Sequence, residues 1–139
     1  MYLRTRFYYE FMSIATTNNI RVTVNVTFNE KYSDIRNENY LFIYQIQIEN
    51  QNDFQVQLLS REWFIFDSLE HPKIVKGEGV VGEQPIIESG ETYSYSSNCV
   101  LNSTIGFMQG VYTFKKISND ELITVLIPKF SLISPHILN

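Results

Sequence analysis

Residues 20–28 read IRVTVNVTF, in which apolar and polar side chains alternate without a break. In an extended chain the apolar side chains, at every second position from Ile20 to Phe28, would all lie on one side. A period of two is that of a β-strand, because successive side chains point to opposite faces of a sheet. The stretch therefore predicts a strand with one buried face and one solvated face.

The strands expected further along the chain follow the same rule, with two departures. In the next strand Phe42, Tyr44, Ile46 and Ile48 face one way, and Gln45, Gln47 and Glu49 face the other. Within residues 55–67 the apolar positions change sides at Leu59. The change at Leu59 predicts a β-bulge or a strand buried on both faces. A later run changes sides at Pro128, which predicts a bulge or a sheet edge.

The whole chain shows short alternating runs separated by turn residues, and no run with helical spacing. Aromatic residues make up 14% of the sequence, a content that suits pleated sheets. We therefore predict an all-β fold, an antiparallel β-sandwich of the immunoglobulin or fibronectin type III kind with about seven or eight strands. Residues 16–139 form this single domain, and residues 1–15 form an N-terminal extension. Met12 is a second candidate initiator, which leaves open whether residues 1–11 belong to the native protein.

The charge and composition exclude several classes of function. Eleven basic and fifteen acidic residues leave a formal net charge of −4, so the broad positive surface that nucleic-acid binding needs is not expected. No apolar run is long enough to span a membrane, and the N-terminal residues do not resemble a signal peptide. The single cysteine, Cys99, has no internal partner for a disulfide. We predict a cytoplasmic protein.

The glycine-rich run GEGVVG carries the first candidate site. Its glycines match the spacing GxGxxG, but no helix pattern follows, as a dinucleotide-binding turn would require. One reading is that these glycines turn the chain between two sheets. The other is that their amides form a nest for an anion, such as pyrophosphate or a nucleotide, beside Lys73 and Lys76. The candidate ligand-binding residues of this second reading are Lys76, Gly77, Glu78, Gly79 and Gly82.

Catalytic and metal-binding patterns are not found in the sequence. The two histidines, His71 and His136, are isolated and have no ligand spacing around them. Cys99 has no histidine partner nearby in sequence and is expected to be a small buried strand residue. We therefore predict no catalytic residues, no metal site, no cofactor and no enzymatic activity.

Arg61 and Trp63 form a pair of residue types that is enriched at protein interfaces. A tryptophan on a central strand is also a common core residue of sandwiches. We expect Trp63 in the core and leave Arg61 as the candidate contact for a partner.

Several motifs along the chain together resemble the bacterial ApaG family. They are Val56-Gln-Leu-Leu59, Arg61 with Trp63, Gly77-Glu-Gly-Val-Val-Gly82 followed by Gln84-Pro85, Ser89-Gly-Glu91, Tyr93-Ser-Tyr95, Gly106-x-Met108-x-Gly110-x-Tyr112 and Ile127-Pro128-x-Phe130-x-Leu132. Ser89 departs from the family, which usually has proline there. The resemblance implies a fibronectin-type sandwich that binds partners, as the domain does within larger eukaryotic proteins. The bacterial members are often linked by name to cobalt and magnesium efflux.

These observations lead to one functional prediction and two alternatives. The prediction is a non-catalytic binding or adaptor domain that contacts an unidentified protein, with a homodimer as one possible assembly. The first alternative is a module that binds a phosphate-containing small molecule through residues 77–82. The second is an accessory factor in Co²⁺ or Mg²⁺ homeostasis.

Overall fold

A computed structural model describes residues 11–138 of the chain. It confirms the prediction of an antiparallel β-sandwich, and it has nine strands where about seven or eight were predicted. No helix in this part of the chain is long and apolar enough to cross a bilayer. The strands are β1 (Phe11–Thr17), β2 (Ile20–Phe28), β3 (Tyr40–Asn50), β4 (Val56–Asp67), β5 (Lys73–Glu78), β6 (Ile86–Ile87), β7 (Thr92–Leu101), β8 (Ile105–Lys116) and β9 (Leu122–Ile133); two short 3-10 helices, η1 (Ile35–Asn37) and η2 (Pro135–Leu138), complete the elements.

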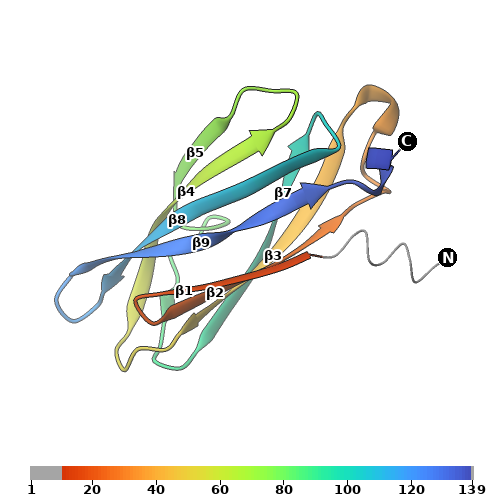
Figure 1. The fold of residues 1–139 in the computed structure, drawn as a ribbon. Helices are drawn as coiled ribbons and strands as arrows, with labels where there is room; N and C mark the ends of the chain where they lie inside the picture. Colours follow the sequence, from red (N-terminus) through yellow and green to blue (C-terminus); the bar gives the residue numbers. More distant parts are fainter. Residues whose placement is uncertain (1–10, 139) are drawn as a thin grey trace.

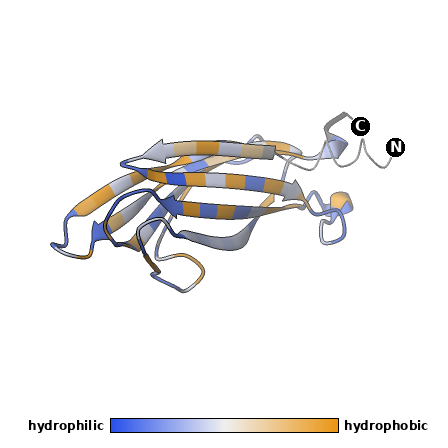
Figure 2. Cartoon of the chain, turned by 90° about the horizontal axis from the view of Figure 1, so that it is seen from below, coloured by the Kyte–Doolittle hydropathy of each residue, from blue (hydrophilic) through white to orange (hydrophobic). Residues whose placement is uncertain are grey.

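The strands form two sheets (Figure 1). The first sheet has the order β1-β2-β3-β7, and the second has the order β5-β4-β8-β9 with the short β6 also paired to β4. Figure 2 shows the predicted alternation as bands of apolar and polar colour along the strands. In β2 the apolar side chains of residues 20, 22, 24, 26 and 28 are all buried, so this strand has the inward face that its sequence predicted.

The first sheet begins at β1, which pairs with β2 over its whole length, for example Ala15 with Val22. Residues 11–15 are thus part of the sandwich, and the boundary predicted after residue 15 falls inside a strand. Short side chains such as Ser13 and Ala15 give β1 a weak apolar pattern, which is why the sequence did not indicate it. The rest of the predicted extension lies outside the described residues.

Both predicted changes of side are β-bulges. In β4 the register shifts between Leu58 and Ser60, so Leu59 is the extra residue. In β9 the register shifts between Ile127, which faces Gly110 of β8, and Phe130, which faces Met108. Two residues, Pro128 and Lys129, lie between them opposite a single residue of β8, so one of the two is extra. An inserted residue restores the inward direction of the side chains that follow it. The two places in the sequence where the apolar positions change sides therefore mark strands with an inserted residue.

The core lies between the sheets and is richest in aromatic rings near its centre. Tyr44 of the first sheet contacts Trp63 and Phe130 of the second, with ring centroids 5.5 and 5.6 Å apart. Trp63 and Phe130 meet edge to face at 5.8 Å. Trp63 is only 3% exposed, which confirms its predicted place in the core.

The two long sides of the sandwich differ. On one side β1 and β9 lie next to each other (Figure 1), and the amide of Leu126 donates a hydrogen bond to the Thr17 hydroxyl at 3.2 Å. On the other side the edge strands are β5 and β7, and no hydrogen bond joins them anywhere in residues 11–138. The sandwich is therefore closed along β1–β9 and open along β5–β7.

Candidate functional site

The open side holds a cleft of about 440 Å³, which we call the β5–β7 cleft. Its walls come from both sheets, β3 and β7 on one side and β4, β5 and β8 on the other. The residues that give it its chemistry are Arg61, Trp63, Lys73, Val75, Tyr95 and Cys99. Along β7 the inward-facing Tyr93, Tyr95, Ser97 and Cys99 are only half-buried, because β5 does not cover them.

Arg61 reaches this cleft because of the bulge at Leu59. Without the extra residue the alternation from Leu58 would turn Ser60 inward and Arg61 outward. With it, Arg61 pairs with the inward-facing Tyr112 of β8 and stands on the same face as Trp63. Arg61 is accordingly half-buried on the inner side of the sheet, and not on the outer surface.

The guanidinium of Arg61 is fixed against the glycine-rich run. Its Nη1 donates to the carbonyl oxygens of Glu78 at 3.0 Å and Gly79 at 2.8 Å. A Cβ added to Gly77 would lie 2.6 Å from Nη1, so this glycine provides the space in which the guanidinium lies. Arg61, the predicted partner contact, and Gly77, Glu78 and Gly79 of the predicted ligand-binding set thus form one site.

The amides of the glycine-rich run are partly occupied. The amide of Gly79 donates to the carbonyl of Leu59 at 2.8 Å, and the amide of Val80 donates to the carbonyl of Glu83 at 2.8 Å. Val81 and Gly82 both have positive φ, +48° and +79°, as the central pair of a tight hairpin turn requires. Positive φ at Gly79 and Gly82 agrees with a turn at these glycines. The turn joins β5 to β6, which both pair with β4, so the prediction that it carries the chain between the two sheets is wrong. Pyrophosphate binding through residues 77–82 stays a prediction.

Lys76 and Glu78, the charged members of the predicted ligand set, alternate to the other face of β5. Lys76 pairs with Glu62 across the β4–β5 ladder, and its Nζ lies 3.6 Å from the Glu62 carboxylate. Lys73 pairs instead with the inward-facing Ile65 and lines the cleft. Lys76 and Glu78 therefore do not line the β5–β7 cleft, whereas Lys73 lines it together with Arg61. Arg61 also borders a separate pocket that is lined by Lys76, Gly77 and Glu78.

The polar groups of the cleft are uncharged, apart from Arg61 and Lys73. The Tyr95 hydroxyl makes a hydrogen bond with the Tyr112 hydroxyl across the sandwich, and burial raises the pKa of both tyrosines. Burial also raises the pKa of the Cys99 thiol to about 11, against a weaker opposing effect of Lys73. At neutral pH these groups are protonated, so the charge of the lining side chains is positive.

Tyr95, Ser97 and Cys99 of β7 were not predicted as site residues. The sequence does show their alternation with Ser94, Ser96 and Asn98, which identified a strand. It carried no signal that this strand lies at an open edge. That property depends on which strands neighbour it, and neighbours are set by the order of strands in the sheet.

Metal-binding groups do not gather within the described residues, where no three His, Cys, Asp or Glu side chains lie close enough to hold an ion. His136 contacts Glu30, with its Nε2 2.9 Å from the carboxylate, and His71 is exposed in the turn before β5. The role in Co²⁺ or Mg²⁺ homeostasis stays a prediction.

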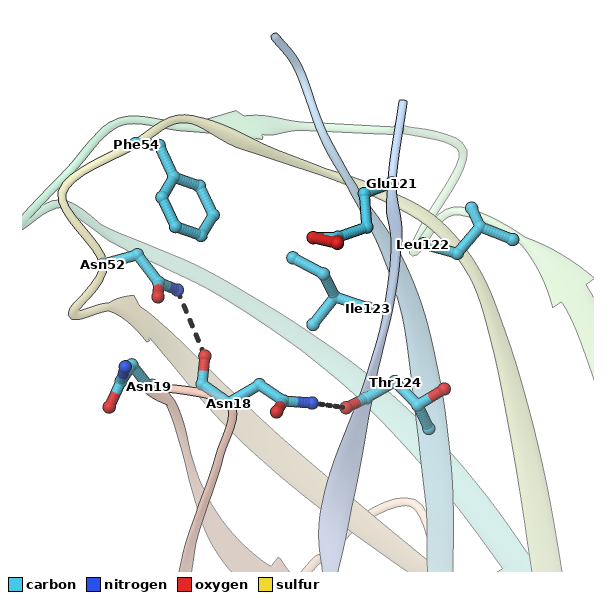
Figure 3. A pocket seen from close by; sticks show the side chains of 8 residues that line it. All are labelled: Asn18, Asn19, Asn52, Phe54, Glu121, Leu122, Ile123 and Thr124. Atoms are coloured by element: carbon cyan, nitrogen blue, oxygen red, sulfur yellow. Dashed lines mark hydrogen bonds between the residues drawn. The ribbon is translucent and has the colours of Figure 1, made fainter. Parts of the chain in front are cut away.

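A second pocket, of about 460 Å³, lies at one end of the sandwich where three turns meet (Figure 3). There Nδ2 of Asn18 donates to the carbonyl of Thr124 at 2.8 Å, and Nδ2 of Asn52 donates to the carbonyl of Asn18 at 3.1 Å. These bonds tie the β1–β2 turn to strand β9 and to the β3–β4 turn. Because these amide groups serve to join the turns, the β5–β7 cleft is the better candidate for binding.

Known proteins share both the sequence and the fold. The ApaG domain family matches residues 30–116. The chain is 43% identical over 123 residues to Protein ApaG of Methylobacterium radiotolerans, covering 88% of this chain and 94% of that protein. It is 40% identical over 120 residues to Protein ApaG of Vibrio campbellii, with 86% and 94% covered. The crystal structure of the ApaA protein from Bordetella pertussis superposes with a TM-score of 0.80 at 34% identity, covering 89% of this chain and 99% of that one. The chain belongs to the ApaG domain family.

Proposed function

We propose that this ApaG domain is a cytoplasmic, non-catalytic binding module that holds an extended segment of a protein partner at its open side, between β5 and β7. The observation that carries the proposal is the pair of unclosed strand edges beside a cleft of about 440 Å³. Unpaired strand edges offer backbone donors and acceptors to an added strand, and this is a common way of binding peptides.

Apolar side chains at this edge support the proposal. Ile74 is 62% exposed, Val75 is 40% exposed and Val81 is 64% exposed. Natural proteins usually protect an edge strand with charges, prolines or a covering segment. In the described part of the chain nothing covers β5, and its two lysines stand beside these apolar residues. Such an edge favours contact with another chain.

The backbone of Val81 also supports a binding role for this region. A β-branched residue at positive φ is an outlier, since its side chain crowds the backbone there. Such strain is concentrated at functional sites. Here it places an apolar side chain at the rim of the cleft, where a partner would meet it.

The groups in the cleft are poorly suited to catalysis. A nucleophilic cysteine needs a lowered pKa and a base beside it, whereas the pKa of Cys99 is raised to about 11. In the part of the chain that the structure describes, the side chains that line the cleft include no histidine and no carboxylate. These features support recognition and not reaction.

Site-specific photocrosslinking in cells tests the proposed function. A photoreactive amino acid in place of Ile74 should give discrete adducts with one or a few proteins. The same amino acid in place of Gln47, which is exposed on the outer face of the other sheet, is the matched control. Adducts of twice the mass of the chain would identify a second copy as the partner. Identical or absent adducts from both positions would contradict the proposal.

A further inference from the structure

The charges of the β5–β7 cleft restrict the chemistry of what it can bind. Among residues 11–138, the ionised side chains that line it are Arg61 and Lys73, and both are cations, although the chain as a whole has a net charge of −4. The nearest buried carboxylate, Asp67, is held by the hydroxyl of Ser103 and the amide of Asn102, each at 2.6 Å. The cleft is therefore a locally positive place in an acidic protein.

Arg61 still has hydrogen-bond donors available. Its Nη1 is used by the carbonyls of Glu78 and Gly79, while Nε and Nη2 have no partner among residues 11–138. Neither of these atoms is an unsatisfied buried group, so solvent or a ligand reaches them. Nε and Nη2 form one edge of the guanidinium, and that edge matches the two oxygens of a carboxylate. Because the other edge is held by two carbonyls, the guanidinium loses little freedom on binding.

Beside this cation the cleft has apolar and aromatic walls. Trp63, Val75 and Tyr95 line it together with Cys99 and Met108. Arginine, tryptophan and tyrosine are the residue types that contribute most to binding at protein interfaces. A ligand that carries one negative charge next to an apolar group would satisfy both parts of the site.

We infer that the β5–β7 cleft binds a carboxylate of the partner segment, with an apolar residue next to it, and that Arg61 receives the carboxylate while Lys73 assists. This inference rests on the proposed function and specifies its ligand. The open strand edges favour an extended peptide over a free metabolite, because a peptide also uses the unpaired backbone groups of β5 or β7. A single carboxylate matches the one free edge of Arg61.

A titration followed by ¹⁵N–¹H NMR tests the inference with small probes. N-acetyl-phenylalanine has a carboxylate beside an aromatic group, and N-acetyl-phenylalaninamide is its neutral counterpart. We expect saturable shifts of the amides of Val75, Tyr95 and Cys99 with the acid, at millimolar concentrations, and much smaller shifts with the amide. Equal shifts with both probes would overturn the inference.

Variants identify the cation that binds. Arg61→Gln should weaken binding of N-acetyl-phenylalanine about tenfold, the effect of removing a charged hydrogen-bond donor. Lys76→Gln, on the opposite face of β5, should leave it unchanged. Lys73 is exposed, so Lys73→Gln is expected to fold. It should weaken binding of N-acetyl-phenylalanine roughly threefold, and it tests the inference even if Arg61→Gln fails to fold. Unchanged affinity in both Lys73→Gln and a folded Arg61→Gln would overturn the inference.

A further titration with phenyl phosphate tells a carboxylate site from a phosphate site. Phenyl phosphate that binds at the same amides while N-acetyl-phenylalanine does not would show a phosphate site and overturn the carboxylate assignment. Failure of this inference can also be told from failure of the proposed function. Adducts at position 74 without a preference for the acid would leave the protein-binding module standing and remove only the carboxylate chemistry.

Discussion

At the scale of single residues, each glycine of the GEGVVG run meets a different structural requirement, although the sequence does not distinguish them. Gly77 leaves room for the guanidinium of Arg61, since a Cβ there would lie 2.6 Å from Nη1. Gly79 has φ +58°, and a Cβ there would lie 2.0 Å from the carbonyl oxygen of Glu83. Gly82 has positive φ but open space around it. The glycines of this motif are therefore required by local packing and turn geometry as much as by any ligand.

Substitution of these glycines by alanine should have graded effects on the free energy of unfolding. Gly79→Ala clashes with backbone and adopts a disfavoured φ, so we expect a loss of roughly 3 kcal/mol or more. Gly82→Ala meets only the cost of positive φ, about 1–2 kcal/mol. Gly77→Ala displaces the end of a flexible side chain, so its loss should be the smallest, about 1 kcal/mol or less. Urea denaturation measures all three, and a Gly77→Ala loss equal to that of Gly79→Ala would refute this account.

At the scale of strands, position in the sheet decides which elements are exposed. β1 and β5 are both edge strands, but β1 is anchored to β9 through Thr17 and the neighbouring Asn18. β5 pairs only with β4. The bulge in β4 adds a further link, because the carbonyl of Leu59 accepts from the Gly79 amide and from Nε2 of Gln84 at 2.9 Å. These bonds hold the loop after β5 to the bulge in β4.

Removal of β1 tests whether the closed side is needed for stability. A chain that begins at Asn18 loses the β1–β2 ladder and the bond from Leu126 to Thr17. At about 1 kcal/mol for each of several backbone hydrogen bonds, we expect the free energy of unfolding to fall by roughly 3 kcal/mol or more. Thr17→Ala in the full chain is the control for the single bond and should cost about 1 kcal/mol. A truncated chain as stable as the full one would show that β1 is not needed for folding.

At the scale of the whole molecule, protonated hydroxyl and thiol groups lie between the sheets beside the open cleft. Tyr95 and Cys99 of the first sheet and Tyr112 of the second all have raised pKa values because burial disfavours their charged forms. Folding then depends on pH, because the folded state retains protons that the unfolded state loses.

The sign of this dependence predicts weaker stability in alkali. The contribution of Cys99 is fully present below its ordinary pKa of 9.0 and is lost as pH rises towards its folded pKa of about 11. The tyrosines act in the same direction above pH 10, their ordinary value. We expect the urea midpoint to fall between pH 8.5 and roughly pH 10.5, and to fall less steeply in Cys99→Ala. The same slope in Cys99→Ala and the unsubstituted protein would exclude Cys99 as a contributor.

The amino-acid sequence by itself determined the class of fold, the strands with a strong apolar alternation and both bulges, but not β1. Alternation in residues 20–28 and the parity changes at Leu59 and Pro128 are local patterns, and each produced the strand or bulge it predicted. Trp63 was placed in the core because a tryptophan on a central strand is a common core residue of sandwiches. Periodicity is a property of neighbouring residues, so one strand can be recognised without knowing the others.

Only the tertiary structure decided where a ligand could bind. It showed that β5 and β7 are the unclosed edges, that Arg61 rests on Gly77, and that Lys73 and not Lys76 lines the cleft between these edges. Arg61 and Tyr95 are 34 positions apart in the sequence, and they line one cleft because the two sheets pack face to face. No local pattern encodes such a meeting. It follows from the order of the strands, which forms only when distant parts of the chain pack together.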